Sequence, residues 1–92
     1  MKTFNVLKLI EALEPKPKTF HVYSNSIHLV FDDSYWVLDQ EEEKLLGFSG
    51  NPNPDGDGVF CRASGFKNVD EDKMANMITT VLKVREDLKE EN

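Results

Sequence analysis

The segment spanning residues 27–38 constrains the fold more than any other part of this chain. Two runs of aliphatic and aromatic residues, which suit pleated and half-buried strands, flank the polar triplet at 32–34. Aspartate and serine favour turns because their side chains bond to the local backbone. The pattern therefore predicts a β-hairpin in which Phe31 pairs with Tyr35 across the turn.

The two-residue period of a strand then sorts the side chains onto two faces. We predict a preceding strand over residues 20–24, joined by a turn at 25–26 that places Val22 opposite Leu29. One face has the composition of an ordinary core and holds Phe20, Val22, Ile27, Leu29, Phe31, Tyr35 and Val37. The second, which we call the mixed face, combines aromatic, aliphatic and imidazole groups and holds His21, Tyr23, His28, Val30, Trp36 and Leu38. A one-residue slip in the pairing would exchange the two sets.

Helices are predicted at both ends of the chain. Thr3 is the expected N-cap of a first helix over residues 4–14, with an apolar stripe at Val6, Leu9, Ile10 and Leu13. Asp70 is the expected N-cap of a longer helix over residues 71–90. The apolar stripe of that second helix consists of Met74, Met77, Ile78, Val81, Val84 and Leu88.

Residues 39–48 allow two interpretations. An approximate capping box at Asp39 and Glu42 with Gly47 as a C-cap would make a short helix. Alternatively, residues 40–43 form a turn and residues 44–49 a fourth strand, which would place Gly47 opposite Trp36 and leave room for the indole. The strand extends the hairpin consistently, and we prefer it.

The resulting fold class is α+β in a single domain covering residues 1–92. An antiparallel meander of four or five strands, the fifth at residues 59–64, is flanked by an N-terminal helix and a long C-terminal helix. A chain of 92 residues can bury one core.

Composition excludes several classes of function. The net charge is −6 and lysine and arginine are not clustered, which argues against direct nucleic-acid binding. No apolar run approaches the roughly 20 residues that span a membrane, and the N-terminus makes a poor signal peptide. Cys61 is the single cysteine, so no internal disulfide can form and a reducing cytoplasm is the simplest location.

The sequence gives little support to catalysis or to a cofactor. His21 and His28 would be diagonal neighbours on the mixed face, but two histidines without a third ligand are too few for a typical metal site. Cys61 with a histidine is the only conceivable nucleophilic pair, and no motif accompanies it. We expect no enzyme activity, no cofactor and no bound metal.

We therefore predict a non-catalytic protein-binding module, an inhibitor or adaptor acting on a larger protein. Its size and acidity are similar to those of phage-encoded antagonists of host defence, an analogy of size and charge only. Aromatic residues are enriched at binding hot spots, so one candidate surface holds the mixed-face residues His21, Tyr23, His28, Trp36 and Leu38. The other candidate surface is acidic and holds Asp39, Glu41, Glu42 and Glu43. Two alternatives remain: a homodimeric structural or assembly subunit, and a domain that binds a small molecule or metal through the two histidines.

Overall fold

A computed structural model describes residues 3–90 and confirms the α+β fold. Five antiparallel strands form one sheet in the order β1-β2-β3-β4-β5, so each strand pairs with its neighbour in the sequence. In chain order the elements are α1 (Val6–Ala12), β1 (Thr19–Val22), β2 (Ser26–Val30), β3 (Tyr35–Asp39), β4 (Lys44–Phe48), β5 (Val59–Ser64) and α2 (Glu71–Glu90).

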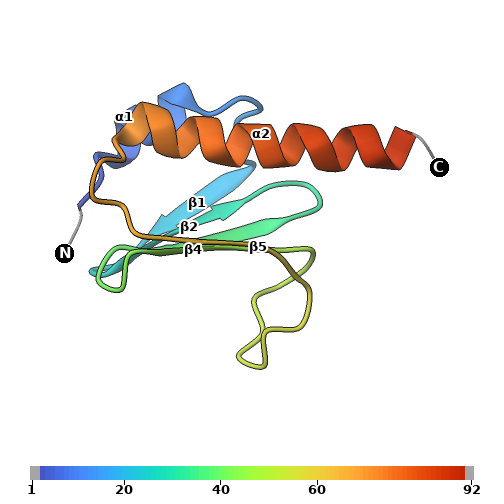
Figure 1. Ribbon diagram of the computed structural model, residues 1–92, viewed down its shortest axis with the longest axis horizontal. Helices are drawn as coiled ribbons and strands as arrows, with labels where there is room; N and C mark the ends of the chain where they lie inside the picture. The colour runs from blue at the N-terminus through green and yellow to red at the C-terminus, as the bar shows by residue number, and fades with distance from the viewer. Residues whose placement is uncertain (1–2, 91–92) are drawn as a thin grey trace.

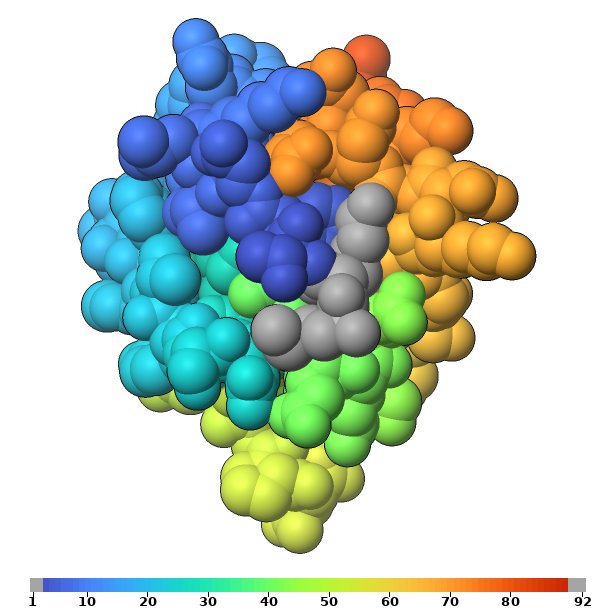
Figure 2. Space-filling model, turned by 90° about the vertical axis from the view of Figure 1, so that its left-hand side faces the viewer, coloured from blue at the N-terminus to red at the C-terminus, as the bar shows by residue number. Residues whose placement is uncertain are grey.

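Both helices lie on the same face of the sheet (Figure 1). They pack against each other, with α1 above the β1 side and α2 above the β4 side (Figure 2). The loop between β4 and β5 extends on the opposite side of the sheet, where no helix lies (Figure 1). The molecule therefore has two layers, and one sheet face has no helical cover.

The hydrophobic core fills the space between the helices and the sheet. Apolar side chains alternate along the central strands, as a sheet covered on one face requires. Its fully buried members are Leu9, Leu13, Ile27, Leu29, Trp36, Leu38, Leu45, Phe66, Met74 and Ile78.

The predicted pairing of the hairpin is wrong by one residue. Val30, rather than Phe31, pairs with Tyr35. The backbone N–H of Phe31 donates to the carbonyl of Ser34 at 2.9 Å, which closes a turn with only two central residues, at positions 32–33. The predicted pairing requires a three-residue turn, and the difference of one residue exchanges the faces of β3 relative to β2.

This slip corrects the placement of two residues assigned to the mixed face. Trp36 and Leu38 are fully buried, each with 0% exposure, and face the helices. Tyr35 and Val37, predicted to lie in the core, are half-buried on the opposite face. The pairing predicted between β3 and β4 is confirmed, including Trp36 opposite Gly47.

The β1–β2 pairing also differs from the prediction, without exchanging the faces. Val22 pairs with Ile27, and His21 lies directly opposite His28. The turn is centred at residues 24–25, because the N–H of Tyr23 donates to the carbonyl of Ser26 at 2.8 Å. A shift of two residues preserves side-chain direction, so His21 and His28 still share a face.

Two helix predictions differ in outcome. The α1 helix is shorter than predicted, and its N-cap is Asn5 instead of Thr3. The Asn5 side chain accepts the N–H of Lys8. The α2 helix has the predicted bounds, and Asp70 caps it by accepting the N–H of Lys73 at 2.9 Å. Residues 40–43 form a turn before β4, so the short-helix alternative is wrong.

Candidate protein-binding surface

The candidate surface is the sheet face that carries no helix, which we call the open face. One row of paired residues crosses all five strands on this face, because each member lies opposite the next. From β1 to β5 the row reads His21, His28, Val37, Leu46 and Arg62. Tyr23, Val30, Tyr35 and Lys44 share this face through the same alternation, and with the row they define the open face.

A histidine–tyrosine network forms the β1–β3 half of the open face. His28 is its centre: Nδ1 lies 2.8 Å from the hydroxyl of Tyr35, and Nε2 lies 3.2 Å from the hydroxyl of Ser26. The rings of Tyr23 and Tyr35 both meet the imidazole edge-on, with centroids 4.8 and 5.6 Å away. These contacts hold the imidazole in one orientation, while 54% of the Tyr23 side chain remains exposed.

The surroundings shift the titration of two groups in this network. Partial burial lowers the pKa of His28 below 6.5, and the nearby His21 lowers it further. Partial burial also raises the pKa of Tyr35, and the Tyr23 hydroxyl adds to that shift. Both shifts favour the uncharged forms of His28 and Tyr35 at neutral pH.

The other half of the open face carries two basic residues, of which Lys44 is paired with Glu42. Lys44 and Arg62 are exposed and flank Leu46 around a shallow hollow of about 330 Å³. The one acid in the neighbouring row is Asp39, and its carboxylate accepts the backbone N–H groups of Glu41 and Glu42. An acidic protein thus presents a face of aromatic, aliphatic and basic side chains.

The predicted acidic surface is the turn between β3 and β4, and most of its members have structural contacts. Asp39 holds the turn through the two hydrogen bonds already described. Glu43 has a positive φ of 54°, and its carboxylate accepts the N–H of Phe66 at 3.2 Å. Glu42 pairs with Lys44 at 3.2 Å, and Glu41 points into solvent. Four acids close in sequence therefore do not form one free acidic patch.

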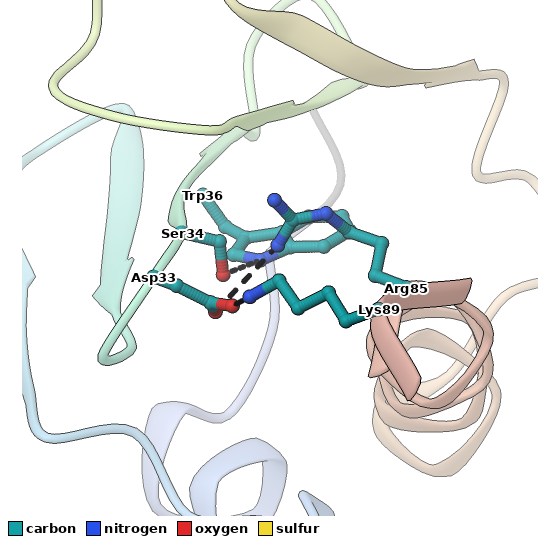
Figure 3. Close-up of polar contacts among 5 residues, drawn as sticks. All are labelled: Asp33, Ser34, Trp36, Arg85 and Lys89. Atoms are coloured by element: carbon teal, nitrogen blue, oxygen red, sulfur yellow. Dashed lines mark hydrogen bonds and ion pairs between the residues drawn. The ribbon is translucent and has the colours of Figure 1, made fainter. Parts of the chain in front are cut away.

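A cluster of ion pairs and aromatic contacts lies beside Trp36 under α2 (Figure 3). Asp33 in the β2–β3 turn pairs with Lys89 and, at 3.6 Å, with Nη1 of Arg85. The Arg85 guanidinium lies 4.0 Å from the ring centroid of Phe60. Phe60 in turn contacts the Trp36 ring edge-on at 5.3 Å.

The Trp36 indole N–H has its own partner in this cluster. It donates to the buried hydroxyl of Ser34 at 3.1 Å (Figure 3). A buried indole requires such an acceptor, and the turn supplies it two residues away. Trp36 therefore belongs to the core in both packing and hydrogen bonding.

A separate groove of about 800 Å³ lies between α2, the connector over residues 14–18 and the β2–β3 turn. Pro15, Phe31 and Leu82 give it apolar surface. Lysines and carboxylates both line the rest, including Lys18, Lys83, Glu14, Asp32 and Glu86. Charges of both signs on its walls select no particular class of ligand.

The groups considered for metal binding and catalysis do not converge. Within residues 3–90, no three histidine, cysteine or acidic side chains are grouped so that they could hold a metal ion. Cys61 lies opposite Gly47, on the same face as Trp36, whereas both histidines lie on the open face. Burial also raises the pKa of the Cys61 thiol, which favours the unreactive protonated form.

Comparison of the chain with protein-family models, with curated proteins and with solved structures finds no match. Neither helix within residues 3–90 combines the length and apolar content that crossing a membrane requires.

Of the residues predicted for binding, the structure brings His21, Tyr23 and His28 together on the open face. It buries Trp36 and Leu38 and places the acids at the end of the sheet. Sequence reasoning missed Tyr35, Val37 and Leu46 as half-buried residues of the open face. The predicted pairing of Asp39 with Lys44 could have identified this face of β3 and β4, because two charged residues opposite each other mark the solvated face of a sheet.

Proposed function

We propose that the chain is a non-catalytic protein-binding domain and that its open face is the binding surface. The observation that supports this most is the position of both helices on one face, which leaves the row from His21 to Arg62 without helical cover. The two ends of the row are exposed, and its three middle members are half-buried. Tyrosine and arginine are enriched in binding hot spots, and an uncovered aromatic and aliphatic surface is a typical interaction site.

The charge of this surface indicates the kind of partner. Lys44 and Arg62 lie at one end of the open face, and Asp39 is already bonded to backbone N–H groups. Within residues 3–90, Arg62 has no ion-pair partner, so its charge is free to meet a partner's carboxylate. The fitting partner is a protein segment with an apolar stripe and flanking aspartate or glutamate residues.

The positions of the reactive groups support a binding role over a catalytic one. Both ring nitrogens of His28 have hydroxyl partners, and the Cys61 thiol lies on the other side of the sheet. A role as an inhibitor or adaptor, in the cytoplasm, is the finer prediction within this proposal.

The experiment is selection of peptides from a displayed random library, followed by titration of the purified peptides by fluorescence anisotropy. We expect the selected peptides to combine apolar residues with acidic ones. The substitution Val37→Lys on the open face should weaken binding at least tenfold. Arg62→Glu should weaken binding by a smaller factor that decreases as salt is added, because exposed charges are screened.

The matched control is Val84→Lys, the same change at an exposed valine on α2. It should leave peptide affinity unchanged, and so should charge reversal at Glu41 and Glu42. If Val37→Lys binds the peptides as well as the parent does, the open face is not the binding surface. Loss of binding on reversing Glu41 and Glu42 would instead support the acidic turn.

A further inference from the structure

The β1 strand is an exposed edge of the sheet. All four of its residues are exposed, and it contains neither proline nor charge. Phe20 and Val22, on the helix side, remain 39% and 54% exposed although their partners Leu29 and Ile27 are buried. Sheet edges without such protection pair readily with another strand.

The other edge strand of the sheet, β5, is protected against pairing with a further strand. The β5 strand carries the exposed Arg62 and an irregularity in its pairing between Gly47 and Phe48. Charge and bulges both hinder the addition of a strand. An added strand is therefore better accommodated at β1 than at β5.

Hydrogen-bond alternation shows which backbone groups of β1 face outward. The N–H of Tyr23 bonds to Ser26, so Tyr23, His21 and Thr19 direct their N–H and C=O groups toward β2. Phe20 and Val22 then direct theirs away from the sheet. Four strand groups, two N–H and two C=O, are available at this edge.

We propose that β1 pairs with β1 of a second copy of this chain, antiparallel and about a two-fold axis at His21. In this register Phe20 of each copy lies opposite Val22 of the other, and all four outward groups of each strand form hydrogen bonds. The two sheets join into one, and the apolar side chains of Phe20 and Val22 cover each other on the helix side. This proposal concerns the edge of the sheet and does not depend on the function proposed for the open face.

The choice of a second copy rests on two forms of complementarity. Any strand with two outward residues flanking a central one fills all four groups, and β1 meets this requirement itself. The two ends of β1 also differ in charge. The exposed Lys18 precedes the strand. The acidic turn between β3 and β4 lies near the end that follows Val22, because the Gln40 N–H donates to the carbonyl of Asn25. Antiparallel pairing brings each lysine toward the partner's acidic turn.

The mass of the protein across a wide dilution series, measured by sedimentation velocity, tests the proposal. We expect a reversible dimer of twice the 10.5 kDa chain. Val22→Pro should give a monomer that keeps its fold, because the lost N–H has no partner within the monomer and edge strands tolerate proline there. Val22→Lys should also give a monomer, whereas Val84→Lys on α2 should dimerise as the parent does.

Two results would overturn the proposal. One is a parent chain that stays monomeric at every concentration, which would leave β1 open to a different protein or to none. The other is a dimer that Val84→Lys disrupts and Val22→Pro does not, which would place the contact on α2. Peptide binding to the open face can be measured in either case, so failure here is distinguishable from failure of the proposed function.

Cross-linking tests the register. Position 21 lies opposite itself as a non-hydrogen-bonded pair, where Cα atoms are about 4.5 Å apart and a disulfide can form. In a Cys61→Ser background, His21→Cys should form a disulfide-linked dimer on oxidation. Thr19→Cys, on the same face but about 13 Å from its copy, should not. Equal cross-linking at both positions would contradict the proposed register.

Discussion

Replacing Gly47 with alanine tests the packing that decides which sheet face is buried. Gly47 lies opposite Trp36 and has no side chain where two aromatic rings converge. A Cβ atom added there would lie 3.0 Å from Phe60 Cζ and 3.0 Å from Trp36 Cζ3. Both rings belong to the packed cluster under α2, so neither can move away freely.

The expected magnitude follows from two opposing effects. Overpacking of this kind costs about 1–3 kcal/mol. Replacing glycine also reduces the conformational entropy of the unfolded chain, which stabilises the folded state by about 0.4–1 kcal/mol. We therefore expect Gly47→Ala to lower the free energy of unfolding by about 1–2 kcal/mol, whereas Gly50→Ala, with nothing within 4 Å, should be neutral or slightly stabilising.

The assay is equilibrium unfolding in urea, followed by the fluorescence of Trp36. With a slope of about 1 kcal/mol/M, the midpoint of Gly47→Ala should fall by about 1–2 M. The loss should shrink in a Phe60→Leu background, since one of the two rings is then absent. If Gly47→Ala and Gly50→Ala have the same midpoint, Trp36 does not pack against Gly47, and the assignment of buried and open faces is wrong.

Three further predictions concern single residues. The pKa of His28 is lower in the folded state, so its contribution to stability is complete above pH 6.5 and is lost as the pH falls through the folded pKa. Urea midpoints should therefore fall less between neutral and acidic pH in His28→Gln than in the parent, and an equal fall would contradict this. Burial raises the pKa of Cys61, so its reaction with thiol reagents at neutral pH should be slower than that of free cysteine and should recover in denaturant; a rate equal to free cysteine would show an unburied thiol. Asn5→Ala removes the N-cap of α1 and should cost about 1 kcal/mol by urea unfolding, while an unchanged midpoint would mean that the cap contributes nothing.

The features predicted correctly from sequence depend on local signals. The bounds of α2 follow from the cap at Asp70 and the apolar stripe that begins at Met74. The bounds of β5 follow from alternation between a glycine-rich loop and Gly65. In each case neighbouring residues carry the whole signal, and tertiary packing reinforces it.

The hairpin register could not be determined from local signals. Asp32, Asp33 and Ser34 are all turn residues, so turns with two or three central residues are equally consistent with them. The choice depends on distant contacts: Trp36 packs edge-on against Phe60 of β5, and Asp33 pairs with Arg85 some fifty residues later. One residue of register then decides whether Trp36 or Tyr35 lies on the open face.

Part of the candidate site, like part of the fold, could be predicted from the sequence. The β1 and β2 members, His21, Tyr23 and His28, follow from alternation and keep their places despite a two-residue shift. The acidic turn is visible as composition, but its hydrogen bonds to the backbone are not. Composition therefore indicated an acidic surface where the structure has a turn held by its own carboxylates.

The most direct test of the central claim is a map of amide chemical shifts during titration with a library-selected peptide. If the open face is the binding surface, the largest changes should fall on the row through His28, Val37 and Leu46, with α2 little affected. Changes concentrated at the groove beside Leu82 and Lys83, with none along that row, would contradict the proposed function.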